Sequence, residues 1–180
     1  MFKFQGKEYE YIDMKPNQTR VNERRVELPL AMEFLNEFQG KEILEVGNVT
    51  RHYKPKTETW HDVVDLYEKI EWQNIMNEDI LSWNPTKKYD AVLSISTLEH
   101  TDDPLLAVNR ILKMAPNVLI TIPFGYSRTH EVFEAFPDLL FMKRINLEEN
   151  QWVEATREDV ADTEYNTPFP FANAIMILKI

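Results

Sequence analysis

The chain has 180 residues, of which 43% are hydrophobic, and it contains no cysteine. This length suits one domain with a substantial core, and the lack of cysteine excludes disulfides, thiolate zinc sites and a cysteine nucleophile. A net charge of −10, from 30 acidic and 20 basic residues, would repel the phosphate backbone of a nucleic acid. The apolar runs are too short to span a bilayer, and the N-terminal stretch MFKFQGKEYE lacks the hydrophobic core of a signal peptide. We therefore expect a cytoplasmic protein with no nucleic-acid or membrane partner.

The N-terminal part of the chain predicts a small hairpin followed by a helix. The stretch FKFQGKEYEYI alternates around Gln5-Gly6, which is typical of two short strands joined by a turn. Apolar residues then recur at helical spacing from Val26 to Phe38, with Pro29 in the first turn and Gly40 as the stop. Residues 1–25 would thus form an arm in front of the core.

Five β-type runs follow in the middle of the chain: Glu42–Val46, Val63–Tyr67, Asn74–Ile80, Tyr89–Ser96 and Asn117–Pro123. Near-continuous apolar stretches such as AVLSI and NVLITI indicate a parallel sheet that is buried on both faces. The connections after the second and third runs look short for full helices.

A helix is expected between the last two of these runs. Asp103 can cap it and Pro104 suits its first position, while apolar residues line one face as far as Ala115.

The C-terminal part differs, because LLFMKRI, QWVEAT and ANAIMILKI are strand-like with little helix between them. The predicted fold class is therefore α/β: a Rossmann-like three-layer sandwich whose mostly parallel sheet ends in antiparallel strands. We expect one domain over 1–180, with a cofactor-binding core at 26–125. An acceptor-side segment and the antiparallel edge would occupy 126–180.

Polar residues stand where the predicted parallel strands end, and ligands of open α/β sheets bind at this edge. In chain order these residues are Glu45 and Gly47, then Asp65, then Glu78 and Asp79, then Ser96 through His100. A carboxylate at the second strand end can accept hydrogen bonds from ribose hydroxyls, and an acid at the third can accept one from an adenine amino group. A glycine lets the backbone approach the ligand. The pattern predicts a nucleotide-like cofactor.

Over roughly Leu28 to Gly125 the sequence resembles the class I S-adenosylmethionine (SAM)-dependent methyltransferases. The strongest match is YDAVLSISTLEHTDDPLLAVNRILKMAPNVLITIPFG, with a Tyr-Asp before the fourth strand, a Leu-Glu-His at its end and an Asp-Pro helix start. EILEVGN, VVDLYE and NEDI match the three earlier motifs. The resemblance implies a SAM cofactor and an antiparallel strand pair at the C-terminus.

The resemblance also implies roles for individual residues. Glu45 would orient the loop that holds the methionine part of SAM, with Gly47 and Asn48 beside it. Asp65 would bind the ribose and Asp79 the adenine, with Asp62 or Glu68 and Glu78 as their respective rivals. Ser96, Thr97 and Leu98 would line the pocket beside the sulfonium.

His100 is the candidate catalytic residue, because an imidazole can take a proton at neutral pH; a local structural role is the alternative. Arg24, Arg25 and Glu27 could close over the methionine carboxylate or form an exposed charged turn. Methyl acceptors commonly sit after the fifth strand, where the candidates are Tyr126, His130 and Glu131.

The loop after the first strand departs from the Gly-x-Gly-x-Gly pattern, because Val49 and Arg51 replace the second and third glycines. SAM lacks the pyrophosphate that makes a dinucleotide loop demand glycine, so the departure allows SAM and argues against NAD. Related methyltransferase-like proteins of cell-surface glycan and small-molecule pathways have a similar LEVGN loop.

The implied function is SAM-dependent methyl transfer to a small molecule or glycan precursor, and the alternative is a non-catalytic binding protein that keeps the fold as a scaffold. His52 and His61 lack the spacing of metal ligands, so no metal site is expected. The four tryptophans are interpreted as packing residues: Trp60, Trp72, Trp83 and Trp152.

Overall fold

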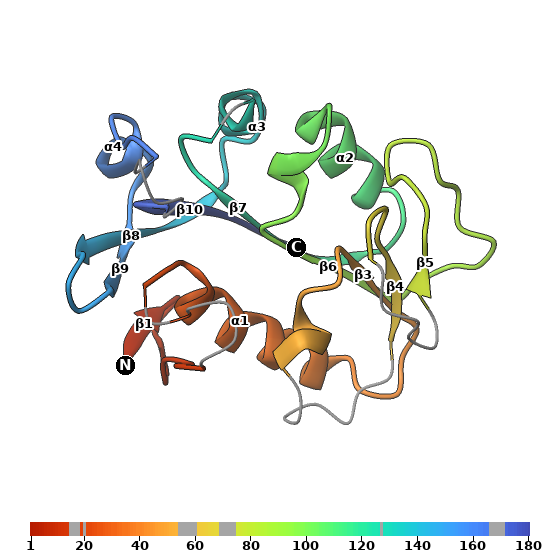
Figure 1. Ribbon diagram of the computed structural model, residues 1–180, viewed down its shortest axis with the longest axis horizontal. Coiled ribbons are helices and arrows are strands. Elements are labelled where there is room, and N and C mark those ends of the chain that lie inside the picture. Colours follow the sequence, from red (N-terminus) through yellow and green to blue (C-terminus); the bar gives the residue numbers. More distant parts are fainter. Residues whose placement is uncertain (15–18, 20, 54–60, 69–74, 127, 166–171) are drawn as a thin grey trace.

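The chain folds around an eight-stranded sheet with the strand order β5-β4-β3-β6-β7-β10-β8-β9, and a separate two-stranded hairpin precedes it (Figure 1). The computed structural model describes residues 1–14, 19, 21–53, 61–68, 75–126, 128–165 and 172–180. The α/β sandwich predicted from the sequence is confirmed.

Five neighbouring strands of the sheet run parallel: β3 (Ile43–Val46), β4 (Asp62–Val64), β5 (Ile75–Met76), β6 (Ala91–Ile95) and β7 (Asn117–Pro123). The bounds of β7 are those predicted. Every residue of β3 and β6 is buried, as expected for parallel strands covered on both faces.

Four of these strands, β3 to β6, are shorter than the sequence predicted, and in β4 and β5 turns end the strand early. The chain leaves β4 after Val64, where the Asp65 carboxylate accepts a hydrogen bond of 2.8 Å from the Tyr67 amide. It leaves β5 after Met76, whose carbonyl accepts a bond of 3.0 Å from the Glu78 amide. Asn74, the expected start of β5, lies outside the described residues. The described parts of the connections after β4 and β5 contain no helix.

Three antiparallel strands complete the sheet, as predicted. β10 (Ala174–Lys179) lies between β7 and β8 (Leu140–Asn146), and β9 (Gln151–Ala155) forms the edge. A single helical turn, α4 (Arg157–Val160), leads from β9 towards β10.

Helices cover both faces of the sheet (Figure 1). α1 (Arg24–Glu37) packs on one face, where the predicted hairpin of β1 (Phe2–Phe4) and β2 (Lys7–Tyr9) joins it in one apolar cluster. The other face carries α2 (Pro104–Ile111), α3 (Thr129–Ala135) and α4, which contribute to a second apolar cluster. The carboxyl ends of the parallel strands are left between these layers.

Helix α1 begins two residues earlier than predicted, so Pro29 lies in its second turn. Proline has no N–H, so the carbonyl four residues earlier loses its helical partner. That carbonyl belongs to Arg25, and it accepts a hydrogen bond of 3.3 Å from the Ile12 amide instead. The arm therefore supplies the bond that the proline removes.

Helix α2 starts as predicted, because the Asp103 side chain accepts a hydrogen bond of 2.8 Å from the Leu106 amide and Pro104 follows. It ends at Ile111, before the expected Ala115. The short helix α3 (Thr129–Ala135) was not predicted.

The tryptophans that the structure describes pack as expected: Trp152 is buried, and Trp83 packs against the core. Trp60 and Trp72 lie outside the described residues. Within the part of the chain that the structure describes, no helix has the length and apolar character needed to cross a membrane.

Candidate functional site

A cavity of about 370 Å³ opens at the carboxyl ends of β3, β4 and β6. Residues from all three strand ends line it, together with residues of the loop after β5. Among the candidates these are Gly47, Asp65, Asp79, Ser96, Thr97 and His100. The volume falls in the range of pockets that hold small molecules. The topology therefore brings together most of the residues that the sequence singled out.

Gly47 lines this cavity at a place that cannot hold a side chain. Its φ of +85° is a left-handed conformation that residues with a side chain avoid. A Cβ atom added here would lie 2.1 Å from Oγ1 of Thr97. The glycine is thus required twice, by the backbone turn and by the neighbouring threonine.

Asp65 ties the second strand end to the loop after β3. One carboxylate oxygen accepts a hydrogen bond of 3.0 Å from the amide of Asn48, and the other accepts the bond from Tyr67. A carboxylate has about four acceptor positions, so each oxygen can accept a further bond from a ligand. Asn48 itself is buried, and its side-chain amide donates to Glu68 at 2.6 Å.

At the third strand end both acids line the cavity, and they differ in how they are held. One carboxylate oxygen of Asp79 accepts a bond of 2.9 Å from the Leu81 amide, whereas Glu78 is exposed. The fixed orientation makes Asp79 the better-placed acceptor of the two.

Glu45 lies under the loop and not in the cavity. Its fully buried carboxylate accepts hydrogen bonds from the amides of Val49 and Thr50, the Thr50 hydroxyl and the His61 ring, the last at 2.7 Å. Burial alone would raise the pKa of Glu45, but the bonds from His61 and Thr50 outweigh it and hold the pKa below its ordinary value. These four bonds occupy the acceptor positions of the Glu45 carboxylate, so its role is to hold the loop in shape.

The residues that replace the missing glycines stay out of the cavity. The loop forms a short 3₁₀ turn, η2 (Thr50–Tyr53), in which Arg51 is buried and its guanidinium donates to the His61 carbonyl. Val49 packs against the apolar cluster of α1. Neither side chain therefore lines the cavity. A 3₁₀ turn of four residues also provides no long helix N-terminus of the kind that binds a dinucleotide pyrophosphate.

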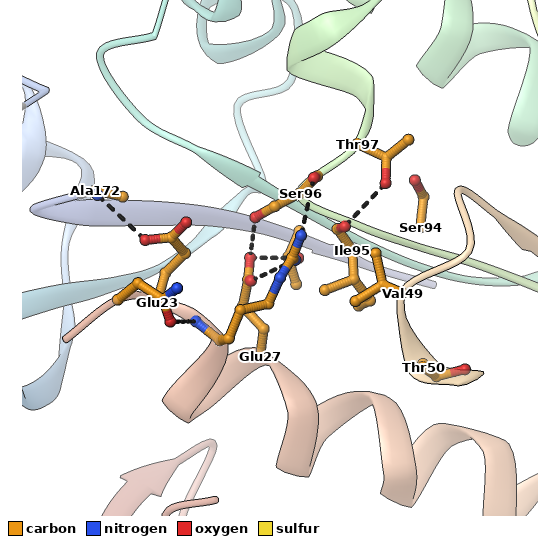
Figure 2. A network of polar contacts seen from close by, with 12 residues as sticks. Glu23, Glu27, Val49, Thr50, Ser94, Ile95, Ser96, Thr97 and Ala172 are labelled. Atoms are coloured by element: carbon orange, nitrogen blue, oxygen red, sulfur yellow. Dashed lines mark hydrogen bonds and ion pairs between the residues drawn. The ribbon is translucent and has the colours of Figure 1, made fainter. Parts of the chain in front are cut away.

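Ser96, directly after β6, is held by the beginning of α1 (Figure 2). Its hydroxyl donates to Glu27 at 2.6 Å, and its carbonyl accepts from Arg24 at 3.2 Å. Glu27 is fully buried, and it also accepts from Thr121 at 2.7 Å and from Arg24 at 2.9 Å. Arg24 and Glu27 thus link the start of α1 to the strand end, so of the two alternatives the exposed charged turn is wrong for these residues.

Arg25 has a different environment. Its guanidinium pairs with Asp13 at 2.8 Å, donates to the carbonyl of Asn150 and lies over the Tyr11 ring. It joins the arm to the β8–β9 connection and does not line the cavity.

Two further buried acids adjoin this link, and the sequence interpretation had missed both as site residues. The Glu23 carboxylate accepts a bond of 3.2 Å from the Ala172 amide (Figure 2), and burial, followed by the charge of Glu27, raises its pKa. Burial likewise raises the pKa of Glu99 to about 8, with Glu27 and Glu23 adding to the effect while its own amide and Arg24 oppose it. The signal for Glu99 was its place in the Leu-Glu-His triplet, where attention went to the histidine.

The triplet forms a 3₁₀ turn, η3 (Leu98–His100). Leu98 is fully buried in the core cluster and does not line the cavity, which corrects its assignment as a pocket residue. His100 is 64% exposed at its side chain and lines the cavity. Partial desolvation and the positive charge of Arg24 lower the pKa of His100, which favours the neutral, proton-accepting form of its ring.

The charge of the cavity is one-sided. Four acids line it: Asp65, Glu78, Asp79 and Asp102. None of its described lining residues is lysine or arginine. Such a lining favours a cationic or neutral ligand over a phosphate. Among the described residues, no group of three or more histidines and acids is arranged to hold a metal ion.

No protein-family model matches the sequence, and no curated protein matches it. Among solved structures, the N-methyltransferase NodS from Bradyrhizobium japonicum WM9, in complex with S-adenosyl-L-homocysteine (SAH), gives a TM-score of 0.50 at 10% identity, covering 88% of this chain and 92% of NodS. Magnesium protoporphyrin IX methyltransferase (ChlM) from Synechocystis PCC 6803, with bound SAM, gives a TM-score of 0.49 at 12% identity. This match covers 84% of this chain and 77% of ChlM.

The similarity to NodS, together with the strand order, identifies the class of fold. The parallel strands with an antiparallel C-terminal edge form the Rossmann-like fold of the class I SAM-dependent methyltransferases.

Proposed function

We propose that this protein binds SAM in the cavity at the ends of β3, β4 and β6 and transfers its methyl group to a small molecule. The observation that carries the proposal is the convergence of Gly47, Asp65, Asp79 and Thr97 on one cavity in a methyltransferase fold. SAM, when bound, supplies a methyl group on a sulfonium that a nucleophile can displace.

The chain's residues fit this ligand in three respects. Gly47 lines the cavity without a side chain, so a ligand can contact the backbone there. Asp65 keeps acceptor positions for ribose hydroxyls, and Asp79 keeps one for an adenine amino group. The acidic lining suits a sulfonium cation.

The contribution of the protein to the reaction would be to hold the acceptor in line with the methyl group, which can supply several kcal/mol. His100, whose lowered pKa favours the neutral ring and which lies at the cavity surface, would take a proton from an acceptor that keeps one.

The test is calorimetric titration of the protein with SAH, which the same site would bind without turnover. We expect binding, and we expect Asp65→Ala to weaken it by about 1–3 kcal/mol, the usual cost of unpaired polar groups. Asp103→Ala is the matched control, because it removes an acid that caps α2 outside the cavity. Absence of SAH binding at millimolar concentration would favour the scaffold alternative.

A further inference from the structure

Ser96 lines the SAM cavity from a position that the pairing between β3 and β6 does not reach. That parallel pairing ends at Ser94, opposite Val46. Beyond it, the Ser96 amide donates a hydrogen bond of 3.0 Å to the Thr121 carbonyl of β7. The ladder between β3 and β6 therefore leaves Ser96 unfixed relative to Gly47, although both residues line the cavity.

The beginning of α1 holds Ser96 at two atoms. Oε1 of Glu27 accepts the Ser96 hydroxyl, and the Arg24 guanidinium donates to the Ser96 carbonyl (Figure 2). Arg24 and Glu27 are themselves paired at 2.9 Å, with side chains that are 16% and 0% exposed. The three residues thus close a ring of hydrogen bonds. Such a ring can maintain the positive φ of Ser96, because a strained backbone persists only where its surroundings determine it.

A chain of contacts leads from Ser96 to the opposite wall of the cavity. Thr97 follows Ser96 directly, and its hydroxyl donates a bond of 3.0 Å to the Ile95 carbonyl. The Thr97 side chain occupies the space beside Gly47, where an added Cβ would lie 2.1 Å from Oγ1. A shift of the Ser96 backbone would therefore move Thr97 relative to the Gly47 turn, and all three residues line the cavity.

We propose that Glu27 is a positioning residue of the SAM site, which holds Ser96 and Thr97 where the cofactor requires them. Neither Glu27 nor Arg24 lines the cavity, so Glu27 would act on the ligand through Ser96 and not by contact. The inference rests on the proposed function, because it assumes that this cavity binds SAM. Binding sites depend on such supporting residues when the groups that touch the ligand must keep a fixed geometry.

A purely structural role for Glu27 makes a different prediction. If Glu27 served only to neutralise Arg24 in the interior, its loss would destabilise the fold, because the guanidinium would lack its counter-charge. The affinity of the folded protein for SAH would then stay unchanged. The dissociation constant of the folded protein, measured separately from its stability, is therefore the readout that distinguishes the two roles.

The first experiment is calorimetric titration of Glu27→Gln with SAH at a temperature where circular dichroism shows the variant to be folded. Glutamine keeps the size of the side chain but offers one acceptor oxygen to partners that use two. We expect SAH to bind at least about three-fold more weakly, which is a typical effect for coupled neighbours.

Thr121→Val is the matched control. The Thr121 hydroxyl donates a bond of 2.7 Å to the same oxygen of Glu27 as Ser96 does, but Thr121 does not line the cavity. This variant also loses one buried hydrogen bond to Glu27, and it should change the SAH dissociation constant by less than about two-fold.

The second experiment repeats Glu27→Gln in a Ser96→Gly background. Glycine has no hydroxyl to bond Glu27 and adopts positive φ without strain, so the link through which Glu27 acts is already broken. The loss of SAH affinity caused by Glu27→Gln should therefore be clearly smaller in this background than in the wild-type protein.

A double variant keeps the proposal testable if Glu27→Gln folds poorly. Arg24→Met with Glu27→Leu removes both charges together, and apolar replacement of a buried ion pair often preserves stability. We expect this variant to fold and to bind SAH at least about three-fold more weakly than the wild-type protein does. Wild-type affinity in the folded double variant would overturn the proposal.

The outcomes separate this inference from the proposed function. If the wild-type protein does not bind SAH, the proposed function fails and the positioning role fails with it. If the wild-type protein binds SAH and Glu27→Gln binds it equally well, only the positioning role is overturned. An equal loss in the wild-type and Ser96→Gly backgrounds also overturns it, because Glu27 would then act by a route other than Ser96.

Discussion

The hydroxyl of Ser96 donates a hydrogen bond of 2.6 Å to the carboxylate of Glu27, which lies 69 residues earlier in the chain. This bond joins the beginning of α1 to the end of the central strand β6 (Figure 2). Ser96 also has a φ of +36°, a region that residues with side chains seldom adopt. A strained backbone at this position persists only where its surroundings hold it, and the buried acid of α1 supplies such a hold.

The first prediction separates the bond from the strain. Ser96→Ala loses the bond to Glu27 but still has a Cβ atom, so the backbone strain at positive φ remains. We expect this variant to lower the free energy of unfolding by about 1–2 kcal/mol. Ser96→Gly loses the same bond and relieves the strain, so its loss should be smaller. Urea unfolding of both variants measures the difference. A glycine variant less stable than the alanine variant would show that φ at this position carries no strain.

The second prediction concerns the contact between Gly47 and Thr97. Gly47→Ala should cost more than about 1 kcal/mol of stability, because its φ is positive and the new Cβ would lie 2.1 Å from Oγ1 of Thr97. In a Thr97→Ala background the two side-chain atoms beyond Cβ are gone, so the same change should cost less. A double-mutant cycle gives the difference. Equal costs in the two backgrounds would leave the backbone turn as the whole reason for the glycine.

The third prediction decides between the two acids after β5. Asp79→Ala should weaken SAH binding by about 1–3 kcal/mol, because the bond from Leu81 holds its carboxylate in place at the cavity. Glu78→Ala, the matched control, should change binding by less than about 0.5 kcal/mol, since its exposed side chain would have to be ordered by the ligand. If calorimetric titrations show that Glu78→Ala weakens SAH binding more than Asp79→Ala does, Glu78 and not Asp79 is the acid that binds the adenine.

Sequence reasoning found the strands and the order of polar residues at their ends, because buried parallel strands and the Asp103-Pro104 start of α2 leave local patterns. It missed α3, because seven residues are too few to show a helical period. Two residues of this helix, His130 and Glu131, had been interpreted as acceptor-side residues. It placed Leu98 in the pocket because a motif does not show which way each side chain of a tight turn faces.

The connection from Glu27 to Ser96 could not be predicted from local patterns, because the two residues lie far apart in the chain and only the packing of α1 on the sheet joins them. One hint was available: Glu27 is the only acid in the otherwise apolar stretch VELPLA. A charged residue on the buried side of a helix needs a polar partner, although the sequence does not say which one.

The fourth prediction concerns acid stability. Glu45 has a lowered pKa, so its contribution to stability is present above its ordinary value of 4.5 and is lost as the pH falls through the folded-state value. His61→Ala removes the imidazole that pairs with Glu45, and we expect it to lower the free energy of unfolding by about 2–4 kcal/mol at pH 7. The loss of stability on acidification should then begin at a higher pH. His52→Ala is the control, because His52 pairs with Glu68 nearer the surface and should cost less than about 1 kcal/mol. Similar losses in both variants would refute a special role for the buried pair.

The last prediction uses the opposite sign of pKa shift at Glu99. Its pKa is raised to about 8, so the folded protein holds this proton more tightly than the unfolded chain does. Its contribution to stability is therefore complete below the ordinary value of 4.5 and is lost as the pH rises towards 8, by up to about 1.4 kcal/mol for each pH unit between the two values. Glu99→Gln cannot ionise, so the variant should gain stability relative to the wild-type protein as the pH rises from 5 to 8. Urea unfolding at several pH values measures this difference, in which the contributions of other groups cancel, and Glu131→Gln should show no such trend. Parallel curves for Glu99→Gln and the wild-type protein would mean that Glu99 is ionised in the folded state at neutral pH.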